Sequence, residues 1–169
     1  MPNEKRQEKI VEFEQYNFER RASGRTAPKF HDNDVRSIKV VPAQKKDEPS
    51  SVEIVFHDRE EKIERILKLK ECANLRFSID FDILSDNTSS AKNSAGQTSN
   101  VEIKDCNDCI ERLMTQGMAD WNVQYPAGKD APASFKFWRL HEFVLVKVLL
   151  HGGTLEVVAR DFEITNKRA

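Results

Sequence analysis

The chain is poor in the residues from which most recognisable active sites and membrane spans are built. Its 169 residues include only six glycines and three cysteines. There is no G-x-S-x-G, no G-x-G-x-x-G and no glycine-rich phosphate loop, which excludes the common serine-hydrolase and nucleotide-binding signatures. The longest apolar run, 143–146, ends at Lys147. It is far shorter than the roughly 18 residues that a membrane-spanning helix needs, so no membrane span is expected.

An excess of charge of one sign is also lacking. The 27 lysine and arginine residues are balanced by 28 aspartate and glutamate residues, and the net charge is −1. Such a chain produces no overall field toward nucleic acid or an anionic membrane, and we expect neither as a partner. Residues 1–9 are rich in charge and lack the apolar core of a signal peptide, which predicts a cytoplasmic protein.

The three cysteines are Cys72, Cys106 and Cys109. An odd number fits reduced thiols in the cytoplasm better than a disulfide framework, so free thiols are predicted. The C-x-x-C spacing of the last two also occurs in zinc ribbons and redox dithiols. A closed zinc site needs four ligands, and no second C-x-x-C motif exists here. The pattern favours small buried core residues, and we expect neither metal nor cofactor.

Two segments have the character of helices. Residues 3–22 are rich in helix formers, and Gly24 is placed to end a helix there. This helix is predicted to form an N-terminal extension over 1–25. The extension is either an appendage of the domain or a surface through which a homo-oligomer forms. A short internal helix is predicted from Asp105, which can cap it, to about Met118. Its buried face is formed by Cys106, Cys109, Ile110 and Leu113.

Much of the remaining chain alternates apolar and polar residues with the period of two typical of strands. Glycines 152–153 predict a hairpin turn, and 167–169 a solvated tail. The Ser- and Asn-rich stretch 85–100 predicts a flexible loop inside a β-rich domain at 30–165. Strands are predicted over 35–41, 52–57, 63–70, 75–84, 101–104, 135–150 and 154–164. The fold class is α+β, mostly β: an antiparallel sheet or sandwich of about seven or eight strands with an N-terminal helix and one short internal helix.

Two pairs of polar residues are candidates for chemistry. The doublet His31–Asp32 occurs in metal-dependent phosphohydrolases, where it acts only together with further His and Asp ligands. Alternatively, the pair is a polar edge, and the side chain of Asp32 or Asn33 forms a turn that sets the entry to the first strand. Asp80 and Asp82 project from one face of a predicted strand, as a cation-binding or acid–base pair would, and as an ordinary solvent-facing pair would. No nucleophile accompanies either pair, which favours the structural interpretation.

Aromatic residues gather around a connection that contains proline and glycine. Trp121, Tyr125 and Trp138 are residue types that often anchor protein interfaces, whereas Phe135 and Phe137 fit the alternation of a core strand. The predicted partner-binding residues are therefore His31, Asp32, Asp80, Asp82, Trp121 and Trp138.

Several short segments, in their order along the chain, carry a resemblance to a known group of proteins. They are His31-Asp32-Asn33, V-R-S-I at 35–38, V-E-I-V-F at 52–56, L-K-L-K-E-C-x-x-L-R-F-S at 67–78 and G-G-T-L-E-V-V-A-R-D-F-E at 152–163. This order resembles small β-rich bacterial families related to the immunity proteins of polymorphic toxin systems. The likeness spans about residues 30–164, omits the N-terminal helix, and has Asn33 in place of a serine. It implies a non-catalytic protein that binds and blocks a partner toxin.

The sequence thus leads to two functional hypotheses. The first is a non-catalytic protein-binding domain, with another protein as its partner. The alternative is a metal-binding domain or hydrolase that uses His31, Asp32 and strand carboxylates.

Overall fold

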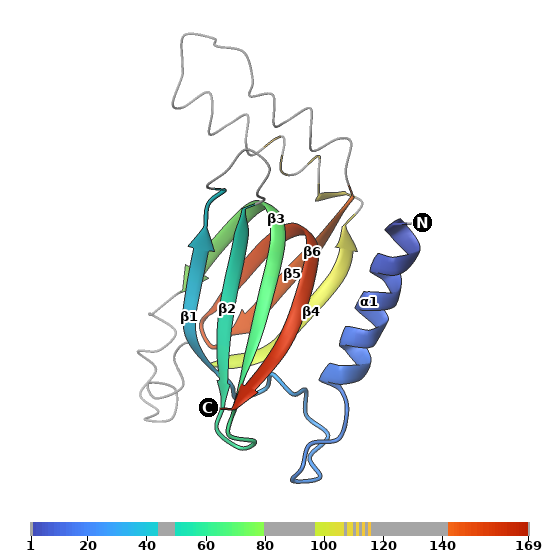
Figure 1. The fold of residues 1–169 in the computed structure, drawn as a ribbon. Helices are drawn as coiled ribbons and strands as arrows, with labels where there is room; N and C mark the ends of the chain where they lie inside the picture. The colour runs from blue at the N-terminus through green and yellow to red at the C-terminus, as the bar shows by residue number, and fades with distance from the viewer. Residues whose placement is uncertain are drawn as a thin grey trace.

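The computed structural model contains one helix and six strands in the part of the chain that it describes (Figure 1). That part comprises residues 2–43, 50–79, 97–106, 108, 109, 111, 113, 115 and 142–168. In chain order the elements are α1 (Pro2–Asn17), β1 (Asp34–Val41), β2 (Ser51–Asp58), β3 (Ile63–Ile79), β4 (Thr98–Cys106), β5 (Phe143–Leu150) and β6 (Gly153–Arg168). The prediction of a mostly β fold with antiparallel strands and an N-terminal helix is confirmed.

All six strands belong to one antiparallel sheet in the order β1-β2-β3-β6-β5-β4. β3 and β6 form its centre. Residues 63–70 of β3 lie between β2 and β6, whereas residues 72–79 pair with the part of β6 that also pairs with β5. Figure 1 shows the sheet curling back on itself, with β4 and β5 behind β2, β3 and β6. The two central strands therefore contribute to both layers of the curled sheet.

A bulge in β3 lies between these two halves of the strand. Glu71 has a φ of 51°, and the register with β6 shifts between Cys72 and Asn74. An extra residue of this kind bends a strand and increases its twist. The carboxylate of Glu71 accepts a hydrogen bond from Arg160 on β6, which ties the bulge to its neighbouring strand.

Backbone hydrogen bonds link the segment before β1 to the start of β4. The N–H of Asp32 donates to the carbonyl of Thr98 at 2.8 Å, and the N–H of Thr98 donates to the carbonyl of Asn33 at 2.9 Å. Asp34 and Gln97 form an isolated bridge beside them. The first and last strands in the sheet order are thus joined at one end, which closes the curled sheet there.

The main core lies on the inner face of the curled sheet. Alternate residues of five strands supply it, and the rings of Phe13 from α1 and Phe30 from the following connector complete it. The Phe30 ring lies 4.9 Å from that of Phe56 and 6.0 Å from that of Phe13, between centroids. The buried strand residues are Val52, Ile54, Phe56, Leu67, Leu69, Val101, Ile103, Val144, Val146, Val148, Leu150, Leu155, Val157, Ala159 and Phe162.

The helix α1 packs between β4 and the second half of β6. Lys9 donates to the carbonyl of Phe162 on β6 at 3.1 Å, and Asn17 donates to the carbonyl of Val101 on β4 at 3.3 Å. Phe13 enters the core, whereas Val11 lies on the opposite, exposed face. The helix therefore shares the core of the sheet, and Figure 1 shows it beside β4 and β6. Within the described residues, no helix has the length and hydrophobicity needed to cross a bilayer.

Several predicted boundaries are wrong. The strand predicted over 135–150 begins at Phe143, since Glu142 before it is not in a strand. The strands predicted at 63–70 and 75–84 are one strand, β3, which continues through the bulge to its last described residue at 79. Residues 98–100 belong to β4 and residues 167 and 168 to β6, because cross-strand pairing incorporates their polar side chains into the ladder. The N-terminal helix ends at Asn17, not at residue 22.

The hairpin turn predicted at the two glycines is confirmed. Gly152 has a φ of 79°, a conformation that glycine adopts without strain. Gly153 begins β6 so close to β3 that a Cβ atom there would lie 2.1 Å from the carbonyl oxygen of Ser78. Only a residue without a side chain fits at this point of the β3–β6 ladder.

The predicted internal helix is described only at residues 109, 111, 113 and 115, so it stays a prediction. Its predicted first residues, Asp105 and Cys106, are in fact the last two residues of β4, since both pair with β5. The seventh and eighth predicted strands are not found among the described residues.

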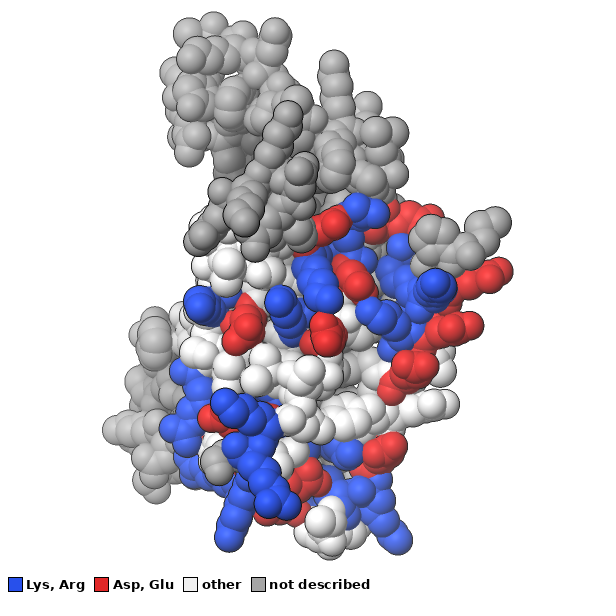
Figure 2. All heavy atoms as spheres, in the orientation of Figure 1, with Lys and Arg blue, Asp and Glu red and all other residues white. Residues whose placement is uncertain are grey.

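The outer face of β1, β2, β3 and β6 carries charges of alternating sign. Lys39, Glu53, Lys68 and Glu163 are neighbours in the register of these four strands, in that order. Figure 2 shows positive and negative side chains interspersed over this side of the molecule. Opposite charges on neighbouring strands are mutually favourable and keep this face hydrated.

Replacing Phe13 with alanine tests whether α1 is part of the core. Its side chain is 4% exposed, so we expect Phe13→Ala to lower the free energy of unfolding by about 3 kcal/mol or more. Val11→Ala on the same helix is the control, because Val11 is 50% exposed and should change stability by less than about 0.5 kcal/mol. Urea denaturation followed by circular dichroism measures both. Equal effects would contradict the packing of α1 on the sheet.

Candidate functional site

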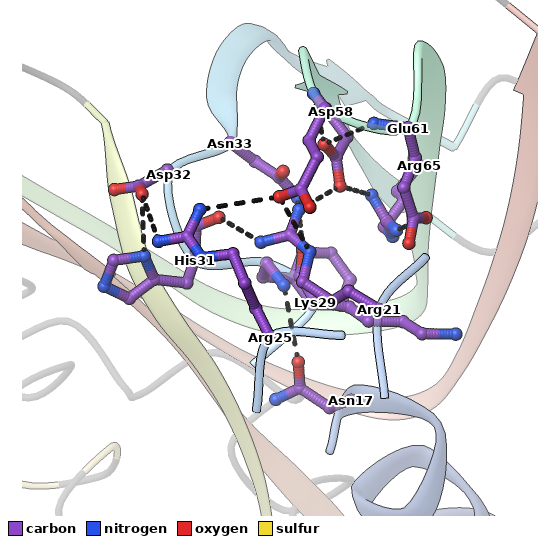
Figure 3. A network of polar contacts seen from close by, with 12 residues as sticks. Asn17, Arg21, Arg25, Lys29, His31, Asp32, Asn33, Asp58, Glu61 and Arg65 are labelled. Carbon is purple, nitrogen blue, oxygen red and sulfur yellow. Dashed lines mark hydrogen bonds and ion pairs between the residues drawn. The ribbon is translucent and has the colours of Figure 1, made fainter. Parts of the chain in front are cut away.

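A cluster of charged side chains is buried where the connector after α1 meets the turn between β2 and β3 (Figure 3). Asp58 is the last residue of β2, Arg65 lies in β3, and Arg21 comes from the connector. The side chains of all three are at most 1% exposed. Ionised groups are seldom so completely buried unless they are paired, which makes this cluster the first place to look for a function.

Asp58 is the centre of the cluster. Its Oδ2 atom accepts hydrogen bonds from Nη2 of Arg21 and Nη1 of Arg65, each at 2.6 Å. Its Oδ1 atom accepts the backbone N–H groups of Glu60 and Glu61 at 2.9 and 3.1 Å. Both oxygens of the carboxylate are therefore occupied by donors from the protein itself.

Arg65 uses the rest of its guanidinium in the same way. Nη2 donates to Oε2 of Glu61 at 2.6 Å and Nε donates to the hydroxyl of Tyr16 at 2.9 Å. That hydroxyl donates in turn to Oδ1 of Asn166 on β6 at 3.1 Å. The guanidinium also lies 5.9 Å from the centroid of the Phe30 ring, a favourable cation–π distance.

Arg21 holds the connector against the hairpin. Its Nη1 donates to the carbonyl of His31 at 3.2 Å, and its Nε lies 3.5 Å from Oε2 of Glu60. Arg25 reaches the same carboxylate oxygen at 3.5 Å. Three arginines thus face three carboxylates across the cluster, and its charges balance.

Two pKa values follow from these contacts. Burial alone would raise the pKa of Asp58, but the N–H of Glu61 and the guanidinium groups of Arg65 and Arg21 outweigh it and lower that pKa below the usual value. Burial alone would lower the pKa of Arg65, but the contacts with Tyr16 and Asp58 outweigh burial and raise that pKa above its usual value. Both groups therefore remain charged at neutral pH.

The predicted doublet His31–Asp32 lies at the edge of this cluster. Nδ1 of His31 is 3.0 Å from Oδ2 of Asp32, and Nη2 of Arg25 is 3.8 Å from the same oxygen. Asp32 has a φ of 63°, and its N–H donates to the carbonyl of Thr98 on β4, so the residue lies in a turn before β1. In the same turn, Nδ2 of Asn33 donates to the carbonyl of Lys29 at 3.1 Å. No third metal ligand accompanies the doublet in the part of the chain that the structure describes. Its Asp faces its own neighbours and not an open site.

The other predicted site residues cannot be placed. Asp80, Asp82, Trp121 and Trp138 lie outside the described residues, as do Tyr125, Phe135 and Phe137. Sequence analysis in turn missed Arg21, Asp58 and Arg65. One signal was present, because Arg65 interrupts the alternation of residues 63–70 at a position that faces the core.

The prediction of free thiols is wrong for two of the three cysteines. Cys106 and Cys109 form a disulfide with their Cα atoms 5.3 Å apart, because the end of β4 and the next described segment bring the two side chains together. Cys72 on β3 is free, and burial raises the pKa of its thiol to about 11. Beside Cys109 lies a cavity of about 470 Å³, bordered on the sheet by Asn74, Arg76, Leu145, Glu156 and Val158.

The comparisons with known proteins add no family to these observations. No protein-family model matches the chain, and no curated protein is significantly similar to it.

Removing one partner of the buried cluster should lower the free energy of unfolding far more than removing an exposed ion pair of the same hairpin. We expect Arg65→Met to lower the free energy of unfolding by about 3–5 kcal/mol, since it leaves Asp58 buried without one of its partners. Arg59→Met is the matched control. Arg59 is 70% exposed and pairs with Asp34, so its loss should cost less than about 1 kcal/mol. Chemical denaturation at pH 7 measures both, and similar losses would refute a structural role of the cluster.

Asp58 should also make stability depend on pH in acid. Because its pKa is lower in the folded than in the unfolded state, its contribution is fully present above about pH 4 and is lost as pH falls through the folded pKa. The difference in unfolding free energy between wild type and Asp58→Asn should therefore narrow as pH is lowered from about 5 toward 2. Denaturation curves at several pH values measure it. A constant difference would show that Asp58 does not titrate as the contacts require.

Proposed function

We propose that the protein is a non-catalytic, cytoplasmic protein-binding domain that blocks a partner, in the manner of the immunity proteins that its sequence resembles. The buried charges support this proposal, because Arg21 and Arg65 both donate to Asp58 and the side chains of all three are at most 1% exposed. His31 and Asp32 are likewise occupied with a turn. These polar groups stabilise the fold. We therefore look for the binding function on the surface of the molecule.

The observation that carries the proposal is the exposure of two large apolar side chains on the core-facing side of the sheet. Val40 on β1 pairs with Val52, which is 2% exposed, and Phe77 on β3 pairs with Leu155, which is fully buried. Pairing places each on the same face as its buried neighbour. Yet Val40 is 61% and Phe77 48% exposed. Exposed apolar side chains that continue the face of the core offer a partner protein apolar area to bury on binding.

The charged neighbours of these anchors lie on the other face of the sheet. Lys39 and Arg76 directly precede Val40 and Phe77, and successive residues of a strand point to opposite faces. The two anchors would therefore contribute apolar contact area, and charges would set the orientation of a partner only from the rim of the interface. A partner would be inhibited by occlusion: its own functional surface is covered, and no bond in it is broken.

A pull-down tests the binding function: the tagged full chain should recover a partner from its native lysate at a ratio near one to one. The complex is then reconstituted from the two purified proteins. We expect the purified partner to lose its toxic activity when the complex forms. Its full activity in the complex would refute blocking. Turnover of a hydrolase substrate by the chain, abolished by His31→Ala, would instead support the alternative function.

Charge placed at the exposed apolar positions tests the surface. Val40→Glu and Phe77→Glu should each weaken the affinity for the recovered partner at least tenfold, measured by calorimetry, without changing the thermal midpoint by more than a few degrees. Phe18→Glu is the control, because Phe18 is 56% exposed at the end of α1, outside this face. Unchanged affinity in both sheet variants would place the interface elsewhere.

A further inference from the structure

The end of β4 brings together three side chains that the cluster around Asp58 does not involve. Cys106 is the last residue of β4, and Asp108 and Cys109 follow within three residues. Both cysteines are buried, whereas Asp108 is exposed. The two cysteines form a second apolar cluster with Leu113, Phe143 and Val158, on the opposite side of the sheet from the main core. The Cys106–Cys109 link thus fixes the segment after β4 onto this outer face.

The three side chains have the composition of a metal site. One ligand atom from each of them lies within 4.8 Å of the others, and Sγ of Cys106 is 3.8 Å from Oδ1 of Asp108. Two ligands bound to a tetrahedral zinc ion at about 2.3 Å are separated by about 3.8 Å, so the two sulfur atoms, now bonded to each other, would move apart to about that distance after reduction. Thiolates favour thiophilic ions such as Zn²⁺. Among the described residues, this is the one group with three such ligand atoms.

We propose that the Cys106–Cys109 disulfide is reversible and that its reduced form binds a thiophilic divalent cation of the Zn²⁺ class, with Asp108 as the third ligand. In the reduction, a dithiol reductant supplies two electrons and two protons. The S–S bond breaks, each cysteine sulfur gains a hydrogen, and the reductant becomes a disulfide. When the cation binds, two Sγ–cation bonds form and the two thiol protons are released to water.

The position of the site explains why cation binding and oxidation exclude each other. The two sulfur atoms either bond to one another or donate their electron pairs to the cation. Two buried thiolates without a cation would be costly, so the reduced, metal-free form holds neutral thiols. The cavity that borders Cys109 leaves room beside the cation for a fourth ligand, either water or a group from a bound molecule. Disulfide and cation are therefore alternative means of fastening the same segment to the sheet.

Cobalt binding to the full-length chain tests the proposal, since Co²⁺ reports thiolate ligation by its visible and near-ultraviolet absorption. After reduction and anaerobic removal of the reductant, the chain should bind about one Co²⁺ with a thiolate-to-cobalt band, and Zn²⁺ should displace it. The oxidised chain should bind none. A thiol titration in denaturant identifies the two samples, with three thiols in the reduced chain and one in the oxidised chain.

Three variants show which residues bind the cation and whether any cysteine would have the same effect. Cys106→Ser should abolish the band, and Asp108→Asn should weaken Co²⁺ binding at least tenfold while leaving the fold intact, because Asp108 is exposed. Cys72→Ser should behave as wild type, since Cys72 lies on β3 and bonds to the carbonyl of Leu69. A fully reduced wild type without a thiolate band would overturn the proposal even if Cys106→Ser failed to fold. None of these outcomes depends on partner binding.

Discussion

The burial of one carboxylate between two guanidinium groups is the interaction that fixes how the helix, its connector and the sheet meet. Asp58 ends β2, Arg65 comes from β3, and Arg21 arrives from the connector after α1. Dehydrating these groups is costly, and the cost is offset only when all the partners are in place. An arrangement of the connector that moved Arg21 away would leave the buried Asp58 with Arg65 as its remaining guanidinium partner. Arg65 also donates to the hydroxyl of Tyr16 on α1, which donates to Asn166 on β6. The position of the buried charges is thereby linked to α1 and β6 as well.

The period of two along the strands was sufficient to predict most of the sheet. Alternation at 52–57 and the two glycines at 152–153 depend on local sequence alone, and the structure has the strand and the hairpin there. The break predicted between 70 and 75 failed for a specific reason. The positive φ of Glu71 and the bulge between Cys72 and Asn74 interrupt the alternation while pairing with β6 continues, so one bent strand has the sequence pattern of two. Alternation alone does not distinguish a bulge from a turn.

The candidate sites were harder to predict because their parts are distant in sequence. Arg21 and Asp58 are separated by a whole strand, and no spacing in the sequence relates them. Arg65 differs, because a charged residue at a core-facing position of a strand requires a buried counter-charge. At Cys106 and Cys109 the helical spacing suggested a shared buried face. Both side chains are indeed buried, but Cys106 belongs to a strand, and this places the two sulfur atoms against each other.

The sharing of β3 and β6 by both halves of the curled sheet has a consequence for how the chain folds. β1, β2 and β3 form one meander and β4, β5 and β6 another, each built from strands that neighbour one another in sequence order. The β3–β6 ladder is the long junction between them, besides the short contact of Asp34 with Gln97, and it pairs Ile63 with Arg168, about a hundred residues away. Closing so long a loop costs chain entropy before the ladder compensates for it, so we expect this pairing to form late in folding. On that expectation each meander forms from strands adjacent in sequence, and the residues of β3 and β6 determine how the two meanders join.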